Sequence, residues 1–174
     1  TVNWTSSFRT PDETLNHWTQ QHHLEGFSPK EMTPWFELME KRLNVHKWEK
    51  APNANNQVLA DGCDKMGYSW KTIPRNVSGC WDLGYCGTGC PTNAKQSMLV
   101  TTIPETLNNN GELVFRAQAR RLLIKGDRVE GVQCSAMHED GVTYTGKNIT
   151  IKAKHTVMAC GGINGPGLLL RSDV

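Results

Sequence analysis

The sequence has 174 residues and a formal net charge of +2, and 37% of its residues are hydrophobic. This length is enough for one domain with a real core. The weak charge excludes the strongly basic surface that is typical of nucleic-acid-binding proteins, and no nucleic-acid partner is expected. The basic residues of one strand-like stretch are expected to be solvated: Arg116, Arg120, Arg121 and Lys125.

The first half of the chain is predicted to be helical. Ser28-Pro29-Lys30-Glu31 has the form of a capping box with proline at the first helical position, and Thr10-Pro11-Asp12-Glu13 repeats it. A third helix is expected over residues 56–66, ending at Gly67, and a fourth over about residues 93–103. Four apolar residues at helical spacing give the second helix one apolar stripe: Met32, Phe36, Met39 and Leu43.

The second half changes to a period of two, which indicates strands. Alternation over residues 113–119, a turn at residues 125–128 and an apolar stretch up to Cys134 predict a hairpin, and a further strand follows the turn at Asp140-Gly141. Residues 156–159 are expected to form a buried parallel strand that ends at Gly161-Gly162, with a helix over residues 164–170. These elements predict an α+β fold.

The strand, glycine turn and helix at residues 157–172 carry a family resemblance. A glycine turn after a parallel strand lets a phosphate or ribose approach the backbone, and the next helix points amides at the ligand. The segment is similar to the second signature of the glucose-methanol-choline (GMC) family of FAD-dependent oxidoreductases, although Gly165 and Asp173 depart from it. The matching residues are Gly161, Ile163, Pro166, Leu168, Leu169, Leu170 and Ser172.

Three other segments resemble the same family in the same order. Thr1-Val2-Asn3 resembles the end of its first flavin loop, residues 94–104 its helix before the adenine-binding strand, and residues 113–132 that strand and hairpin. The resemblance implies part of an FAD-binding α/β domain and an alcohol oxidised to a carbonyl by hydride transfer to FAD. The cofactor-binding residues that it implies are Val2, Asn3, Trp4, Ala119, Cys160, Gly161 and Gly162.

Two parts of the family pattern do not occur in this sequence. The phosphate-binding G-x-G-x-x-G is absent, and the family's catalytic His lies in a domain that this sequence does not match, so no catalytic residue is assigned. The chain is therefore expected to be an internal segment that, alone, binds FAD weakly and is inactive. Its strands would lack their partners, so self-association is expected. The sequence identifies neither the alcohol nor the location of the protein, and a cytochrome or a quinone is considered as electron acceptor.

A glycine-rich loop over residues 80–91 places three thiols, Cys80, Cys86 and Cys90, in the spacing C-x5-C-x3-C-P. Soft thiolates select zinc or iron–sulfur clusters. The loop resembles that of the FAD glucose dehydrogenase branch, which carries an iron–sulfur cluster, and also that of bacterial GMC dehydrogenases and long-chain-alcohol oxidases. The spacing of the three cysteines allows three interpretations: reduced thiols in a tight loop, an iron–sulfur cluster, and a zinc ion, which usually needs a fourth ligand.

The roles expected along the chain divide it into three parts. Residues 1–67 are predicted to be a helical part of the substrate or lid region, residues 68–91 the cysteine and glycine loop, and residues 92–174 part of the FAD-binding domain. The competing class of function is a non-catalytic α+β module for binding or oligomerisation that keeps the GMC scaffold without its chemistry.

Overall fold

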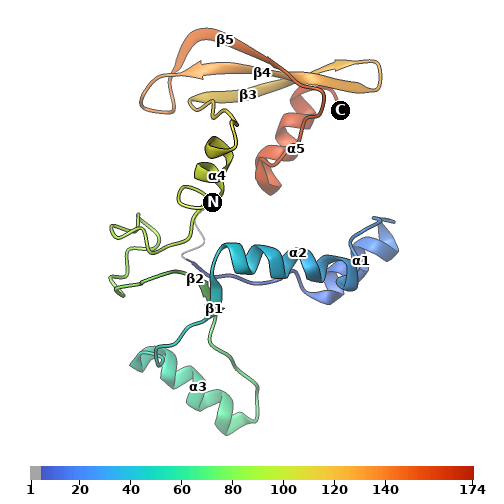
Figure 1. Cartoon of the computed structure of the whole chain (residues 1–174). Helices are drawn as coiled ribbons and strands as arrows, with labels where there is room; N and C mark the ends of the chain where they lie inside the picture. The colour runs from blue at the N-terminus through green and yellow to red at the C-terminus, as the bar shows by residue number, and fades with distance from the viewer. Residues whose placement is uncertain (1–4) are drawn as a thin grey trace. The chain divides into compact units, whose positions relative to one another are not determined.

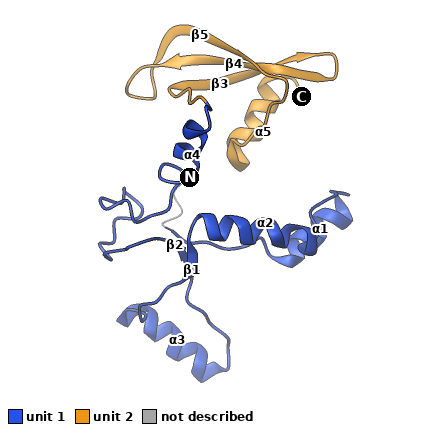
Figure 2. Ribbon diagram, viewed as in Figure 1, with its two compact units in different colours: residues 1–111 blue, residues 112–174 orange. Residues whose placement is uncertain are grey.

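A computed structural model describes residues 5–174, which form two compact units. The units divide after Gly111 (Thr1–Gly111 and Glu112–Val174; Figure 2). The expected flavin residues Val2, Asn3 and Trp4 lie outside the described residues. None of the helices in the described part is long and apolar enough to cross a membrane. The three roles expected for residues 1–67, 68–91 and 92–174 stay predictions.

The first two helices of unit 1 differ in how they begin. α2 (Pro29–Arg42) has the predicted capping box, in which Ser28 and Glu31 exchange side-chain and backbone bonds. α1 (Asp12–Gln21) does not, and the capping box predicted at Thr10 is wrong. The Pro11 carbonyl accepts the first helical hydrogen bonds from the Thr14 and Leu15 amides (3.0 and 3.1 Å), so Thr10 lies outside the helix.

The third helix was predicted well and the fourth was not. α3 (Ala54–Met66) ends at Gly67 in the left-handed conformation. α4 covers Thr102–Asn108, whereas a helix was expected over about residues 93–103. The Gln96 amide donates to the Asn76 carbonyl (2.9 Å) and the Ala94 carbonyl accepts from the Ser78 amide (2.8 Å), so these backbone groups pair with a distant segment instead of with a helix.

The centre of unit 1 consists of extended segments joined by polar contacts. β1 (Val45–Lys47) pairs antiparallel with β2 (Pro74–Asn76), and residues 5–7 and 94–96 lie alongside β2 and its continuation. Thr5 is completely buried and Asn76 is 4% exposed. The Asn76 side-chain amide donates to the Gln96 carbonyl (3.0 Å), and its backbone amide donates to the Thr5 carbonyl (3.2 Å). Polar groups this deeply buried require such partners.

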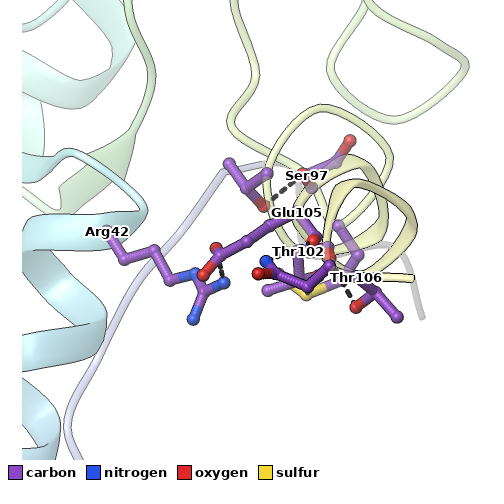
Figure 3. Close-up of polar contacts among 8 residues, drawn as sticks. Arg42, Ser97, Thr102, Glu105 and Thr106 are labelled. Atoms are coloured by element: carbon purple, nitrogen blue, oxygen red, sulfur yellow. Dashed lines mark hydrogen bonds and ion pairs between the residues drawn. The ribbon is translucent and has the colours of Figure 1, made fainter. Parts of the chain in front are cut away.

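One ion pair joins two helices of unit 1. Arg42 at the end of α2 lies beside Glu105 in the first turn of α4, as Figure 3 shows. Within and before α4, the Thr106 hydroxyl donates to the Thr102 carbonyl (2.8 Å) and the Thr101 hydroxyl to the Ser97 carbonyl (2.7 Å). Both charged side chains are substantially exposed, so the pair contributes at most about 1 kcal/mol to stability.

Unit 2 is a three-stranded antiparallel sheet with one helix (Figure 1). Its strands β3 (Ala117–Lys125), β4 (Arg128–Met137) and β5 (Tyr144–Lys152) follow in chain order, with β4 in the centre. The predicted hairpin and the strand after Asp140-Gly141 are confirmed. β3 begins at Ala117, later than the alternating pattern from residue 113 suggested.

Gly131 lies at the closest approach in this sheet. It stands in β4, opposite Leu123 of β3 and Lys152 of β5. A Cβ atom at this position would lie 2.1 Å from the Ile151 carbonyl oxygen and 3.0 Å from the Lys152 Cα. The spacing of β4 and β5 therefore requires a residue with no side chain.

Helix α5 (Gly161–Arg171) is attached to β3 at its carboxyl end. Ser172, which is 6% exposed, accepts a hydrogen bond from the Leu122 backbone amide (2.9 Å) and donates one to the Leu168 carbonyl (2.7 Å). Beside it, the Arg171 Nε donates to the Arg120 carbonyl (3.2 Å). One hydroxyl thus joins the strand to the last turn of the helix.

The parallel strand expected at residues 156–159 does not form. These residues belong to no strand, and Val157 is 88% exposed. A parallel strand exists only when another strand pairs with it, and β3, β4 and β5 pair only with one another in the described part of the chain. The α+β fold class is confirmed, and the predicted glycine turn and helix follow as α5.

The turn between β4 and β5 contains a carboxylate that should titrate at low pH. Asp140 accepts hydrogen bonds from the Thr143 hydroxyl and from the Thr143 and Val142 amides (both 2.9 Å), which lowers its pKa to about 2. Because the folded pKa is lowered, the turn gains stability above the ordinary value of 3.8 and loses it as the pH falls towards 2. An NMR titration of the Asp140 carboxyl carbon should give a midpoint near 2, and a midpoint near 4 would show that these bonds do not form.

Candidate flavin and cysteine-loop sites

The residues that follow the expected flavin loop are held firmly. The Arg75 Nε donates to the Thr5 hydroxyl (2.8 Å), and the Ser7 hydroxyl contacts the Asn76 side-chain oxygen (3.3 Å). Arg75 also lies over the Trp48 ring, 4.7 Å from its centroid. These contacts fix the chain at Thr5 and Ser7, whereas the expected flavin residue Asn3 lies outside the described residues.

The expected adenine residue, Ala119, lies near the start of an edge strand. It stands opposite Cys134 of β4, and an irregularity in the register follows it. β3 is the outer strand of the described sheet, so one side of its backbone lies outside the ladder. At residues 120 and 122 that side is taken by Arg171 and Ser172. The pairing of the backbone at Ala119 with adenine stays a prediction.

The expected phosphate residues lie at the other end of α5. Cys160 precedes the helix and is exposed, and Gly161 and Gly162 occupy its first turn, with open space around the positions of their missing Cβ atoms. α5 has 11 residues and is about 16 Å long. The carboxyl end of α5 binds β3, and Gly161 lies at the opposite end of the helix, so Gly161 does not lie beside Ala119. Their roles toward the sugar, the phosphates and the base of FAD stay predictions.

The three loop thiols line one small hollow of about 50 Å³ in unit 1. Each sulfur has a hydrogen-bonding neighbour. Arg75 Nη2 lies 3.8 Å from the Cys86 sulfur, the Asp82 amide donates to Cys80 (3.4 Å), and the Thr92 hydroxyl lies 3.5 Å from Cys90. None of the cysteines forms a disulfide.

These thiols do not form a ready-made metal site. No group of three or more His, Cys, Asp or Glu side chains among residues 5–174 is placed to hold a metal ion. This arrangement gives no support to the iron–sulfur cluster or the zinc ion considered from the spacing of Cys80, Cys86 and Cys90, and both stay predictions beside reduced thiols in a tight loop.

Cys90 is the most strongly polarised of the three. Its pKa falls from 9.0 to about 7, because the Thr92 hydroxyl and then the Lys95 amide donate hydrogen bonds to the sulfur; burial opposes this, and the Thr92 and Ala94 amides add to the lowering. Cys90 is half-buried and not sealed in a core. The lowered pKa of Cys90 favours the thiolate, which is the nucleophilic form.

Arg75 is the residue of this region that sequence reasoning missed. It contacts Thr5, Trp48 and Cys86, and it lines both the thiol hollow and a larger open cleft of about 570 Å³ beside α3. An isolated arginine in a short strand carries no sequence signal. Only the fold brings its three partners together from distant positions.

Comparison with known families agrees with the resemblance that the motifs suggested. The family model described as GMC oxidoreductase matches residues 1–174, the whole sequence. This chain belongs to the GMC oxidoreductase family. The glycines in the first turn of α5 and the β3–β4 hairpin lie within the region that the family model matches.

Several relatives carry names of GMC enzymes. Long-chain-alcohol oxidase FAO1 of Arabidopsis thaliana is 30% identical over 99% of this chain, and FAO4A of the same plant is 30% identical over 100% of it. An uncharacterized GMC-type oxidoreductase, y4nJ of Sinorhizobium fredii, is 25% identical over 99% of the chain. The chain spans 24% of the length of each of the two plant oxidases and 34% of y4nJ. No solved structure matches it.

Proposed function

We propose that this chain provides part of the FAD-binding domain of an enzyme that oxidises an alcohol to a carbonyl. The observation that carries the proposal is the family match over residues 1–174, supported by relatives named long-chain-alcohol oxidases. When bound, FAD supplies the acceptor for the hydride. The alcohol is a small molecule, and oxygen, a cytochrome or a quinone accepts the electrons from the flavin.

The described residues have separate tasks in this proposal. The outer backbone of β3 at Ala119 pairs with the adenine, and the open first turn of α5 at Gly161 and Gly162 receives the sugar and phosphate groups. Cys160 lies beside this turn. Asn3, with Val2 and Trp4, is proposed to lie near the flavin ring. No described side chain is assigned as the base for the hydride-transfer step.

The full-length protein tests the proposal directly. We expect it to purify with bound FAD and to reduce a redox dye when supplied with a suitable alcohol from a panel that varies in chain length. A protein without flavin and without dye reduction would favour the non-catalytic module.

A charge placed at the proposed phosphate position gives a sharper test. Gly162→Asp sets a carboxylate against the phosphates, and like charges in contact cost kilocalories per mole, so FAD affinity should fall roughly tenfold or more. Gly62→Asp makes the same substitution at an open position in α3 and should leave the affinity unchanged. Equal FAD affinity for both variants and the parent protein would contradict the assignment of Gly162.

We also propose that the 174-residue segment alone is inactive, binds FAD weakly and self-associates. Exposed apolar side chains support the last point, because Val157 and Ile163 are each 88% exposed and Leu170 is 75% exposed. A monomer in sedimentation, or stoichiometric flavin in the purified segment, would contradict these expectations.

A further inference from the structure

The thiol hollow, formed by Cys80, Cys86 and Cys90, has no part in the proposed flavin chemistry. It is open to small solutes, since the three cysteines are only half-buried. The loop around it contains no helix or strand, and its own backbone hydrogen bonds form short turns, such as those from the Thr88 and Gly89 amides to the Tyr85 carbonyl. Three reduced thiols in one accessible loop form a cluster of nucleophiles.

The groups around Cys90 suit a sulfur that carries negative charge. A hydroxyl and backbone amides, from Thr92 and Lys95 foremost, point hydrogen-bond donors at it. Donors of this kind stabilise a thiolate, and the thiolate is the form that attacks an oxidant. Cys86 has a different neighbour, the positively charged Arg75.

We propose that this loop is a site of reversible oxidation by hydrogen peroxide, with Cys90 as the attacking thiol and Cys86 as the resolving thiol. The Cys90 sulfur attacks one peroxide oxygen, an S–O bond forms and the O–O bond breaks. Cys90 becomes a sulfenic acid, and the departing hydroxide takes up a proton to become water. The Cys86 sulfur then attacks the Cys90 sulfur, forming a disulfide as the S–O bond breaks and a second water leaves. Two thiols are oxidised by two electrons and one peroxide is reduced to two waters.

Cys86 is favoured over Cys80 as the resolving thiol because the chain segment between Cys86 and Cys90 is shorter than the one between Cys80 and Cys90. Only Gly87-Thr88-Gly89 separates Cys86 from Cys90, and two of these three residues are glycines. A short loop with two glycines closes at a smaller entropic cost than the longer loop back to Cys80 and adapts its backbone more readily.

Peroxide treatment of the full-length protein, followed by peptide mass spectrometry, tests this assignment. The reduced protein is exposed to one equivalent of hydrogen peroxide, alkylated and digested without reductant. We expect a Cys86–Cys90 disulfide that dithiothreitol reverses. Cys90→Ser should abolish it, and Cys86→Ser should leave a sulfenic acid on Cys90 that dimedone traps. Because peroxide is added, the result does not depend on the proposed flavin reaction.

Cys160 serves as an internal control, since it is exposed whereas Cys90 is half-buried. Accessibility alone would make Cys160 react first, and the proposal requires that Cys90 reacts first. If Cys90→Ser fails to fold, Thr92→Val removes one hydroxyl from beside the sulfur and should slow oxidation of Cys90 several-fold while leaving Cys160 unchanged. Resistance of the loop to peroxide, a Cys80–Cys90 disulfide, or faster reaction of Cys160 would overturn the proposal.

Discussion

Replacing Gly131 with alanine is expected to lower the free energy of unfolding by about 3 kcal/mol. The added Cβ would lie 2.1 Å from the Ile151 carbonyl oxygen, which is backbone and cannot rotate away. β4 and β5 would have to separate, weakening their ladder on both sides of the pair Gly131–Lys152. Urea denaturation of the full-length protein, together with amide hydrogen exchange in β5, measures the change.

Gly62→Ala provides the matched control for this substitution. Gly62 lies within α3, where a Cβ would meet nothing within 4 Å. Alanine favours the helix, so the same substitution should raise stability by roughly 0.5–1 kcal/mol. If both variants changed stability equally, the close approach at Gly131 would not be the cause.

Ser172→Ala is expected to lower stability by about 1–3 kcal/mol, because it leaves the buried Leu122 amide without its hydrogen-bond acceptor. The Leu168 carbonyl loses its bond to the hydroxyl as well, and the last turn of α5 should loosen from β3. Hydrogen exchange is the sharpest measurement, since the Leu122 amide should exchange much faster while amides in the β4–β5 ladder change little.

An exposed serine gives the comparison for this variant. Ser78→Ala removes a hydroxyl from an exposed position in unit 1 and should change stability by less than about 0.5 kcal/mol. Unaltered protection of the Leu122 amide in Ser172→Ala would contradict the role given to this side chain. Ser172 matches the family signature by sequence, but its hydrogen bonds to a strand fifty residues away appear only in the structure.

The elements that were predicted correctly depend on neighbouring residues. The Ser28 and Glu31 bonds that start α2 join positions three apart, Gly67 ends its own helix, and the β3–β4 hairpin closes within a few residues. The capping box at Thr10 is a local failure, but two other failures involve distant partners. The backbone at Ala94 and Gln96 pairs with residues 76–78, and residues 156–159 lack a strand beside them, so local pattern misled in both places.

As with the fold, the parts of the candidate site that depend on neighbouring residues could be predicted from the sequence. The glycines that begin α5 and the strand that contains Ala119 could be found from motifs, because each motif is a continuous stretch of chain. The three cysteines could be found too, but their spacing favoured no single chemistry, and the hydrogen bonds around Cys90 are visible only in the structure. Arg75 could not be found, since its partners converge only after folding.

The buried polar centre of unit 1 also sets an order of events during folding. The bond from Arg75 to Thr5 joins residues 70 positions apart, and the contact between Ser7 and Asn76 spans 69. Closing a loop of this length costs conformational entropy before the contacts at its ends can stabilise it, so these bonds should form late in folding. During synthesis, residues 5–7 can form these bonds only after β2 has left the ribosome. Until then Thr5, which is completely buried in the folded protein, is exposed to solvent.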